Sequence, residues 1–380
     1  AAPEEIKRHS SVYTATGSIM LDGQKINLLD TPGMFDFAGG MVQGISAADC
    51  VMITVSGKSG VRVGTKKAYR AAEGKPRMFV VTKLDDENAN FYNVLTELKS
   101  AFGPSVCPVV VPVIADRKVD SYINLIEMKA YRYDKDGKAQ EIPMPTSEVS
   151  EKLSYRVDGL IQAFSEAIAE TDEELFEKFF SGEEFTQKER VDGIHKGMRD
   201  GTITPVACVS AQMLEGVDLL CKEMELLVPE ASDEIAALNQ NGEEVVLHQS
   251  PEEPVCVQVY QTLADPYVGK LSMMWVISGT LKAGAELVNS KTGATEKLNK
   301  LFFLCGKKQT ETAVAEAGDL VAATKLSANT GDTLCDSSRV VSLPRSSFPT
   351  PCYSMAVRPA ARGDEAKVAA AIQKILEEDQ

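Results

Sequence analysis

The stretch Lys25–Phe37, KINLLDTPGMFDF, is the segment around which the rest of the chain can be arranged. Its apolar run between Lys25 and Asp30 predicts a short buried strand, and the dipeptide Pro32-Gly33 then predicts a loop. A carboxylate at the carboxyl end of a buried strand is where open α/β sheets bind their ligands. We therefore expect a ligand site after Asp30, although four such residues also occur at ordinary strand-to-turn corners.

Two further buried strands are predicted to end in polar motifs. Met78–Val81 is followed by Thr82–Asp85, TKLD, and Pro205–Val209 is followed by Ser210-Ala211. The pair resembles the guanine-reading motifs of GTPases. The carboxylate of such a motif accepts two hydrogen bonds from guanine N1–H and N2–H₂, an edge that adenine does not offer. The lysine stem covers the base, and a backbone amide near Ser-Ala donates to O6.

Composition and charge limit the possible partners. The chain has 380 residues, 44% of them hydrophobic and 25% charged, as expected for a globular protein with two or three domains. Its net charge of -15 argues against non-specific binding of nucleic acid, so we expect no DNA partner. No apolar run approaches the ~20 residues of a membrane span, and the first residues lack a signal-peptide pattern. We therefore expect no membrane partner and a cytoplasmic location.

The cysteines and histidines give no sign of a metal centre. The eight cysteines lie far apart, the closest pair being Cys208 and Cys221, and there are three histidines. Several cysteines lie inside apolar runs, which predicts reduced, buried thiols.

The order of predicted elements indicates the fold class. Strands and helices alternate through the first part of the chain, which predicts an α/β doubly wound sheet. From residue 253 short strands separated by glycines predict an all-β barrel. The expected domains are residues 1–230 with an inserted acidic α+β subdomain at 116–204, a polar linker at 231–252, the barrel at 253–342, and the start of a third α/β domain at 343–380. Within these, we expect a helix over 148–169, a strand over 353–358 and a helix over 363–378.

One motif that such a sheet needs is missing from the sequence. A phosphate-cradling G-x-x-x-x-G-K-[ST] loop is expected before the Asp30 strand, and none is present. Gly57-Lys58-Ser59 does not replace it, because Met52 stands where the pattern requires glycine and the segment follows Asp30. We interpret it as a plain strand-to-helix loop.

Together these motifs resemble bacterial elongation factor G. The resemblance continues through the barrel in Ala264–Leu271 (ADPYVGKL), Ser278–Leu281 (SGTL), Ala317–Leu320 (AGDL) and Thr330–Leu334 (TGDTL). Pro3–Arg8 (PEEIKR), Gly60–Thr65 (GVRVGT) and Glu87–Phe91 (ENANF) are more similar to the elongation factor G-like side branch. The resemblance covers nearly the whole chain. It implies a P-loop GTPase-type doubly wound sheet without its first strand and phosphate loop, the inserted subdomain, the barrel and the start of an α/β domain, hence a chain truncated at both ends.

The resemblance also implies cofactors and site residues. The cofactors would be GTP or GDP with Mg²⁺, and the nucleotide-binding residues would be Asp30, Thr31, Pro32, Gly33, Thr82, Lys83, Asp85, Ser210 and Ala211. Asp30 would support Mg²⁺ with Ser11, which stands where the family usually has threonine, and the Gly33 amide would sense the γ-phosphate. Met34 stands where the family has a water-orienting histidine. A thioether cannot donate a hydrogen bond, which could cost on the order of 10²–10⁴ in hydrolysis rate.

Three functions remain open at this stage. The first is a translational GTPase that acts on the ribosome, contacting rRNA and ribosomal proteins, with the acidic insertion facing the ribosomal stalk and hydrolysis slowed by Met34. The second is a ribosome-binding module without nucleotide turnover, and the third is a ribosome-protection protein. For the isolated chain we expect weak or absent GTP binding and no activity, because the phosphates lack their cradle.

Overall fold

The computed structural model describes residues 2–116, 118–145, 148–150, 155–228, 234–265 and 269–379. Contacts divide the chain into two compact units, one of residues 49–230 and one of residues 1–48 with 231–380. Each unit is described by itself. The domain limits expected from the sequence stay a prediction.

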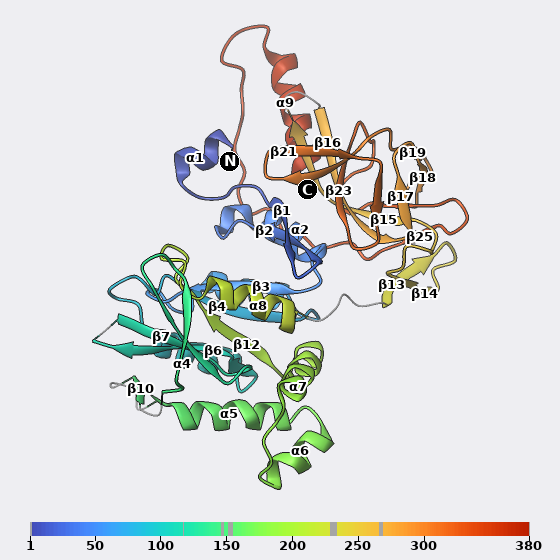
Figure 1. The fold of residues 1–380 in the computed structure, drawn as a ribbon. Coiled ribbons are helices and arrows are strands. Elements are labelled where there is room, and N and C mark those ends of the chain that lie inside the picture. The colour runs from blue at the N-terminus through green and yellow to red at the C-terminus, as the bar shows by residue number, and fades with distance from the viewer. Residues whose placement is uncertain are drawn as a thin grey trace. The chain divides into compact units, whose positions relative to one another are not determined.

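A four-stranded parallel sheet forms the centre of the unit 49–230 (Figure 1). Its strands, in the order β3-β4-β12-β5, are β3 (Val51–Ser56), β4 (Arg77–Thr82), β12 (Thr204–Cys208) and β5 (Val106–Pro108). Helices α3 (Val63–Ala71), α4 (Phe91–Phe102) and α8 (Val217–Leu227) connect or follow these strands. The expected strands over 78–81 and 205–209 and the doubly wound α/β arrangement are confirmed. Because β4 and β12 are buried on both faces, their sequences are continuously apolar rather than alternating.

Helix α4 shows how local sequence sets an element of this unit. Asn90 caps it by accepting a hydrogen bond from the Asn93 amide at 3.0 Å, and Gly103 ends it with a φ of 87°. Its apolar residues recur at helical spacing and are buried. Phe102 meets Tyr69 of α3 and Phe79 of β4, with ring centroids 4.3 and 5.1 Å apart, so both helices cover the same face of the sheet.

The insertion between β5 and β12 contains both strands and helices. Its antiparallel sheet has the order β6-β7-β8-β9, from β6 (Val110–Ala115), β7 (Lys118–Asn124), β8 (Lys129–Tyr133) and β9 (Ala139–Ile142). After the short strands β10 (Glu148–Ser150) and β11 (Tyr155–Arg156) come helices α5 (Val157–Ala169), α6 (Glu173–Phe180) and α7 (Gln187–Asp200). The helix expected over 148–169 therefore begins only at Val157. Residues 151–154 of that expected helix lie outside the described residues.

The segment around Asp30 belongs to the other unit. Strands β1 (Ala15–Leu21) and β2 (Gln24–Asp30) form an antiparallel hairpin, which the 3-10 helix η1 (Phe35–Phe37) and helix α2 (Ala38–Ser46) follow; α1 (Pro3–Arg8) precedes it. The expectation of a buried strand is wrong here. No residue of β2 is fully buried, and Leu28 keeps 38% of its surface exposed. Among the described residues β2 pairs only with β1, so its two faces are not enclosed by a larger sheet.

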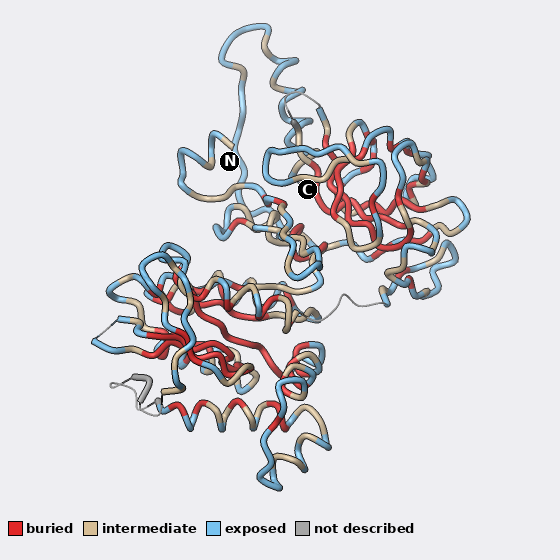
Figure 2. The backbone as a smooth tube through the Cα atoms, viewed as in Figure 1, coloured by how far each residue is buried: buried red, intermediate tan, exposed pale blue. Residues whose placement is uncertain are grey.

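An antiparallel barrel dominates this unit. Eight strands follow the order β19-β18-β24-β15-β16-β23-β20-β21, and β17 pairs with β22. Their bounds are β15 (Cys256–Asp265), β16 (Gly269–Ser278), β17 (Thr280–Lys282), β18 (Glu286–Asn289), β19 (Thr295–Lys297), β20 (Leu301–Cys305), β21 (Lys308–Thr312), β22 (Val314–Glu316), β23 (Leu320–Thr324) and β24 (Thr333–Cys335). Met274 and Val276 of β16 enter one core, whereas Trp275 and Ile277 enter a second core on the other face. Figure 2 shows the central strands β15, β16, β23 and β24 as mostly buried, and the expected barrel is confirmed.

Two stretches of this unit differ from expectation. The polar stretch 231–252 contains β13 (Glu234–Asn239) and β14 (Glu244–His248), which form a sheet with β25 (Val341–Ser342) in the order β14-β13-β25. Residues 353–358 are described but form no strand. Their alternating Tyr353, Met355 and Val357 are 68–79% exposed, so the alternation has no partner strand to stabilise it among the described residues.

Helix α9 (Glu365–Glu378) confirms the last expected helix. None of the helices in the described part of the chain combines the length and apolarity that a bilayer crossing requires.

Candidate functional site

Two neighbouring parallel strands bring their polar ends to one edge of the sheet in the unit 49–230. Val81 of β4 lies opposite Cys208 of β12, and the Val209 amide donates to the Val81 carbonyl at 2.9 Å. Parallel strands run in the same direction, so the residues that follow them emerge side by side. The motif 82–85 and the pair Ser210-Ala211 are thus adjacent.

The closest link between the two motifs is a hydrogen bond from Ser210 to Asp85. The Ser210 hydroxyl donates to Asp85 Oδ1 at 2.7 Å and accepts from the Met213 amide at 3.4 Å. Ser210 is only 1% exposed, and its backbone exchanges hydrogen bonds of 2.9 and 3.1 Å with Glu215. A hydrogen bond to a carboxylate is stronger than a neutral one. The exposed Asp85 carboxylate is therefore held in one orientation by a rigid neighbour.

Lys83 adopts a backbone conformation that the sequence does not reveal. Its φ is 61°, in the left-handed region where residues other than glycine are uncommon. The Lys83 carbonyl accepts from the Asp86 amide at 3.2 Å, which closes the turn that contains Asp85. Residues with such a backbone conformation cluster at binding and catalytic sites, although six other non-glycine residues among those described also have a positive φ.

The loop Gly57–Ser59 lies against this turn. The Gly57 amide donates to the Thr82 carbonyl at 2.8 Å, and Lys58 forms an ion pair with Asp86 at 3.1 Å. A Cβ at Gly57 would come within 3.1 Å of both the Thr82 carbonyl and Leu84. The backbone amide of Asn88, followed by Lys58, lowers the pKa of the Asp86 carboxyl. The loop thus supports the turn 82–86 instead of forming a phosphate loop.

Glu215 is a neighbour that the sequence interpretation missed. Burial and then the charge of Asp85 raise the pKa of its carboxyl, against a hydrogen bond of 3.2 Å from the Tyr122 hydroxyl. Tyr122 is on β7, so Glu215 connects the inserted sheet to the Ser210 turn. No sequence motif marks this position, because the contact depends on the fold of the insertion.

The loop after Asp30 lies in the other unit and is positioned by two glycines of α2. A Cβ at Gly44 would lie 2.3 Å from Thr31 Cγ2, and one at Gly40 would lie 3.0 Å from Pro32 Cδ. The Gly40 carbonyl also accepts a hydrogen bond from Thr14 at 2.7 Å. The absence of side chains at Gly40 and Gly44 lets the loop Thr31–Gly33 pack directly on the helix. The Asp30 and Gly33 positions themselves are exposed.

Met34 is exposed and has a hydroxyl beside its sulfur. Its exposed fraction is 43%, and the Ser10 hydroxyl donates to its Sδ at 3.6 Å. The expected metal residue Ser11 is half-buried next to Ser10. Within the described ranges no three Asp, Glu, His or Cys side chains gather as a metal cluster. Asp30 and Ser11 offer hard oxygen ligands of the kind that Mg²⁺ takes, with phosphate and water completing its shell.

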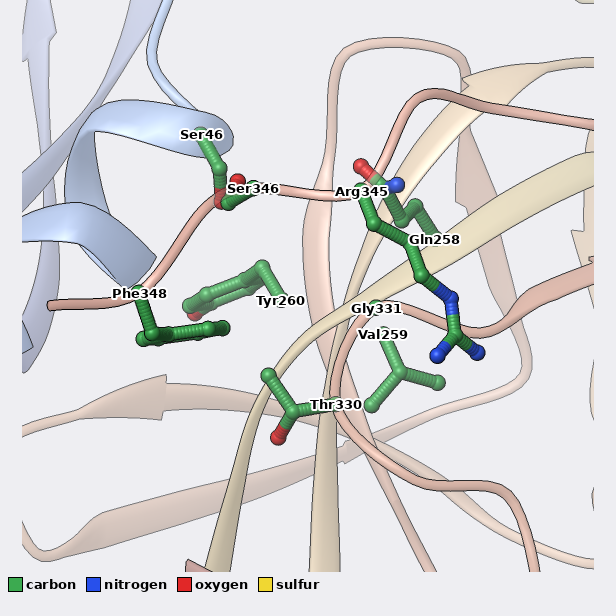
Figure 3. A pocket seen from close by; sticks show the side chains of 9 residues that line it. All are labelled: Ser46, Gln258, Val259, Tyr260, Thr330, Gly331, Arg345, Ser346 and Phe348. Atoms are coloured by element: carbon green, nitrogen blue, oxygen red, sulfur yellow. The ribbon is translucent and has the colours of Figure 1, made fainter. Parts of the chain in front are cut away.

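A small cavity lies in the unit of residues 1–48 and 231–380 (Figure 3). It measures about 90 Å³ and is lined by Ser46, Gln258, Val259, Tyr260, Thr330, Gly331, Arg345, Ser346 and Phe348. This volume has room for about three water molecules. None of the residues expected to bind nucleotide lines it.

Comparisons with known proteins match this arrangement. The elongation factor Tu GTP binding domain matches residues 1–230, and elongation factor G domain 2 matches residues 254–337. An elongation factor G-like protein of Thermotoga maritima is 32% identical over 382 residues, covering 99% of this chain and 54% of that protein. A crystal structure of a Thermus thermophilus protein is 31% identical with a TM-score of 0.82, and covers 100% of this chain and 54% of that one.

The chain thus spans about half the length of these relatives. The first family match alone covers more than half of the 380 residues, and the second falls on the barrel. On this evidence the chain belongs to the elongation factor G family of translational GTPases.

Proposed function

We propose that this chain is the nucleotide-binding part of a GTPase that binds GTP and GDP and acts on the ribosome during translation elongation. The observation that carries the proposal is the Asp85 carboxylate held by Ser210 at 2.7 Å, at the edge formed by β4 and β12. One carboxylate in a fixed orientation can accept both N1–H and N2–H₂ of guanine. Lys83 would cover the base, and the amide of Ala211, which follows Ser210, would donate to O6.

The loop after Asp30, which lies in the other unit and is described by itself, is proposed from family membership alone to bind phosphate. Asp30 and Ser11 would hold Mg²⁺, whose charge neutralises phosphate oxygens when it is bound. The Gly33 amide would donate to the γ-phosphate. Thr31 and Pro32, packed on α2, keep that loop in place.

We infer slow hydrolysis from Met34. The family resemblance places a water-orienting histidine there, and the thioether offers no donor. Met34 is exposed, and the Ser10 hydroxyl proton is directed to its sulfur, so the thioether itself offers a water no donor. The same observation favours a second candidate, a ribosome-binding module without turnover, whereas the oriented Asp85 favours the GTPase.

The inserted subdomain offers a surface for a ribosomal protein of the stalk. On α6 the exposed rings of Phe176 and Phe180 lie 4.6 Å apart, beside the acidic Glu173 and Glu174. Exposed aromatic pairs are typical of contact surfaces, and the surrounding carboxylates would favour a basic partner. The rRNA contacts and the cytoplasmic location rest on family membership.

The proposal is tested by titration with a fluorescent GDP in the presence of Mg²⁺. The titration uses this chain and the chain extended with the flanking sequence of its gene. In the extended chain, GDP but not ADP should displace the label. Asp85→Asn should weaken GDP binding by about tenfold or more, because a charged acceptor is lost. It should also favour xanthosine diphosphate, whose C2 oxygen accepts from the new amide.

Asp86→Asn is the matched control, since it changes the neighbouring carboxylate and should retain guanine selectivity. Unchanged GDP affinity in Asp85→Asn would contradict the assignment of the base site. For the present chain we expect weak or no binding, and micromolar binding displaced only by GDP would contradict that expectation. Ribosome-stimulated GTP hydrolysis by the extended chain then separates the GTPase from the binding module, which would bind without turnover.

A further inference from the structure

Two cysteines that are far apart in the sequence meet in the barrel. Cys256 is the first residue of β15, and Cys335 is the last residue of β24. Their sulfur atoms are 3.8 Å apart, and their exposed fractions are 1% and 0%. They are the described cysteines whose thiols lie within hydrogen-bonding distance of each other.

The strand register places the two side chains as close as an antiparallel sheet allows. Cys256 lies directly opposite Cys335. The flanking pairs are hydrogen-bonded at alternate positions: Asp336 N–H donates to the Val255 carbonyl at 2.8 Å, and Val259 N–H donates to the Asp332 carbonyl at 2.9 Å. Cys256 and Cys335 therefore occupy a non-hydrogen-bonded position, where the Cα atoms are ~4.5 Å apart. Disulfides form at Cα separations of ~4.4–6.8 Å, so a disulfide between these two residues requires no change in their Cα–Cα distance.

Several polar groups act on the thiol of Cys335. The Cys256 thiol, then the Val341 amide and the charge of Arg339, lower the pKa of Cys335, against the effects of burial and of the charge of Asp336. The Val341 amide is 3.5 Å from Cys335 Sγ, and the Val341 carbonyl is 3.3 Å from it. The guanidinium of Arg339 also bonds the Ser278 hydroxyl at 3.0 Å, while its Nε is buried without an acceptor among the described residues. Arg339 is itself ion-paired with Glu253, and the thiolate is the nucleophilic form of cysteine.

We propose that Cys256 and Cys335 are an oxidisable dithiol that a small peroxide converts to a disulfide. Cys335 loses its thiol proton and its sulfur attacks hydrogen peroxide, forming an S–O bond and breaking the O–O bond; the hydroxide that leaves takes up that proton and becomes water. The Cys256 sulfur then attacks the sulfenic acid, forming the S–S bond and releasing a second water, which takes the Cys256 proton. In total two thiols are oxidised by two electrons, and one peroxide is reduced to two waters.

The disulfide would weaken one connection of the barrel. Sulfur atoms in a disulfide are ~2.05 Å apart, so Cys335 Sγ must approach Cys256 and give up its donated hydrogen bond to Val341. Val341 begins β25, a strand of two residues that joins the sheet of β13 and β14. Oxidation would therefore remove one hydrogen bond that links β24 to β25. The short β25 is also where local opening would admit a molecule the size of peroxide.

The proposal is tested on the present chain by peptide mapping. The reduced chain is treated with hydrogen peroxide, unfolded, alkylated and digested. We expect one peptide pair linking Cys256 and Cys335, an intact mass lower by about 2 Da, and reversal by dithiothreitol. Cys107 and Cys208 are comparably buried and have no second thiol within hydrogen-bonding distance among the described residues, so they should oxidise at least about tenfold more slowly.

Two kinds of variant control this experiment. Replacing the exposed Cys305 and Cys352 by serine removes links between molecules and should leave the internal disulfide unchanged. Cys256→Ser and Cys335→Ser should each abolish the mass loss, with circular dichroism showing that the variant is folded. Wild-type chain in which Cys256 and Cys335 stay alkylatable after unfolding, while Cys305 and Cys352 oxidise, would overturn the proposal. This outcome is measured on the wild-type chain, so it does not depend on whether a variant folds.

Discussion

At the scale of single residues, Lys83 combines a strained backbone with a proposed binding role. Its φ of 61° costs a residue with a Cβ about 1–2 kcal/mol relative to the right-handed region. Nothing in the letters TKLD indicates this conformation, because it is imposed by the turn that Asp86 closes. The residue keeps a long side chain at a position where glycine would be more stable.

Lys83→Gly and Lys83→Ala should therefore differ in stability. Both remove the stem proposed to cover the base, but only glycine relieves the positive φ. We expect the glycine variant to have a free energy of unfolding about 1 kcal/mol higher than the alanine variant, measured by urea denaturation. Equal stability would show that the turn is not strained at this position.

Glu223 should make stability depend on pH. Burial raises the pKa of this carboxyl to about 8, against a hydrogen bond from Asn124 at 2.7 Å; Glu127 raises it further and Lys222 lowers it. In the unfolded chain it titrates near its ordinary value of 4.5. Its stabilising effect is thus complete below pH 4.5 and is lost as the pH rises to about 8, on the order of 3 kcal/mol by pH 7.

Glu223→Gln should flatten that part of the stability profile, because an amide does not ionise. The measurement is the free energy of unfolding between pH 5 and pH 8. Glu225→Gln, on the same helix but half-buried, is the matched control and should keep the slope. A Glu223→Gln profile as steep as that of wild type would rule out Glu223 as its cause.

At the scale of elements, the contact between α2 and the loop after Asp30 depends on Gly44. Gly44→Ala would place a methyl 2.3 Å from Thr31 Cγ2, so helix and loop must separate. We expect a loss of about 1–3 kcal/mol in thermal denaturation. Gly39→Ala on the same helix meets nothing closer than 3.9 Å and should be neutral or slightly stabilising.

A second change isolates the cause. Thr31→Ser removes the Cγ2 methyl and should restore most of the stability of Gly44→Ala. If the two changes are simply additive, the clash is not the reason for the loss.

At the scale of the whole molecule, the two units have separate cores. Leu95 belongs to the core of the unit 49–230, whereas Leu281 belongs to the barrel of the other unit, and both are fully buried. We expect two transitions in calorimetry, with each unit unfolding cooperatively. Leu95→Ala should lower one midpoint and Leu281→Ala the other, each by roughly 5–15 °C. A single transition that both variants shift equally would show that the units unfold together.

Local sequence was enough to predict the elements that need little tertiary support. The apolar runs of β4 and β12 correctly predicted buried strands, because a strand covered on both faces is apolar throughout. It failed at β2 and at the start of α5. An apolar run such as Leu28-Leu29 does not show whether a second sheet layer will cover it. Short strands precede Val157, so the helix begins later in the chain than expected.

The sequence by itself determined the family, the order of its α/β and β parts, and the placement of Asp85 beside Ser210, because parallel strands align their carboxyl ends. Only the tertiary structure decided the positive φ of Lys83, the burial of Glu223 and the approach of Cys256 to Cys335. Each of these depends on contacts between residues distant in sequence, through strand register or packing. Such contacts leave no periodicity or motif in the amino-acid sequence, whereas strands, caps and loops do.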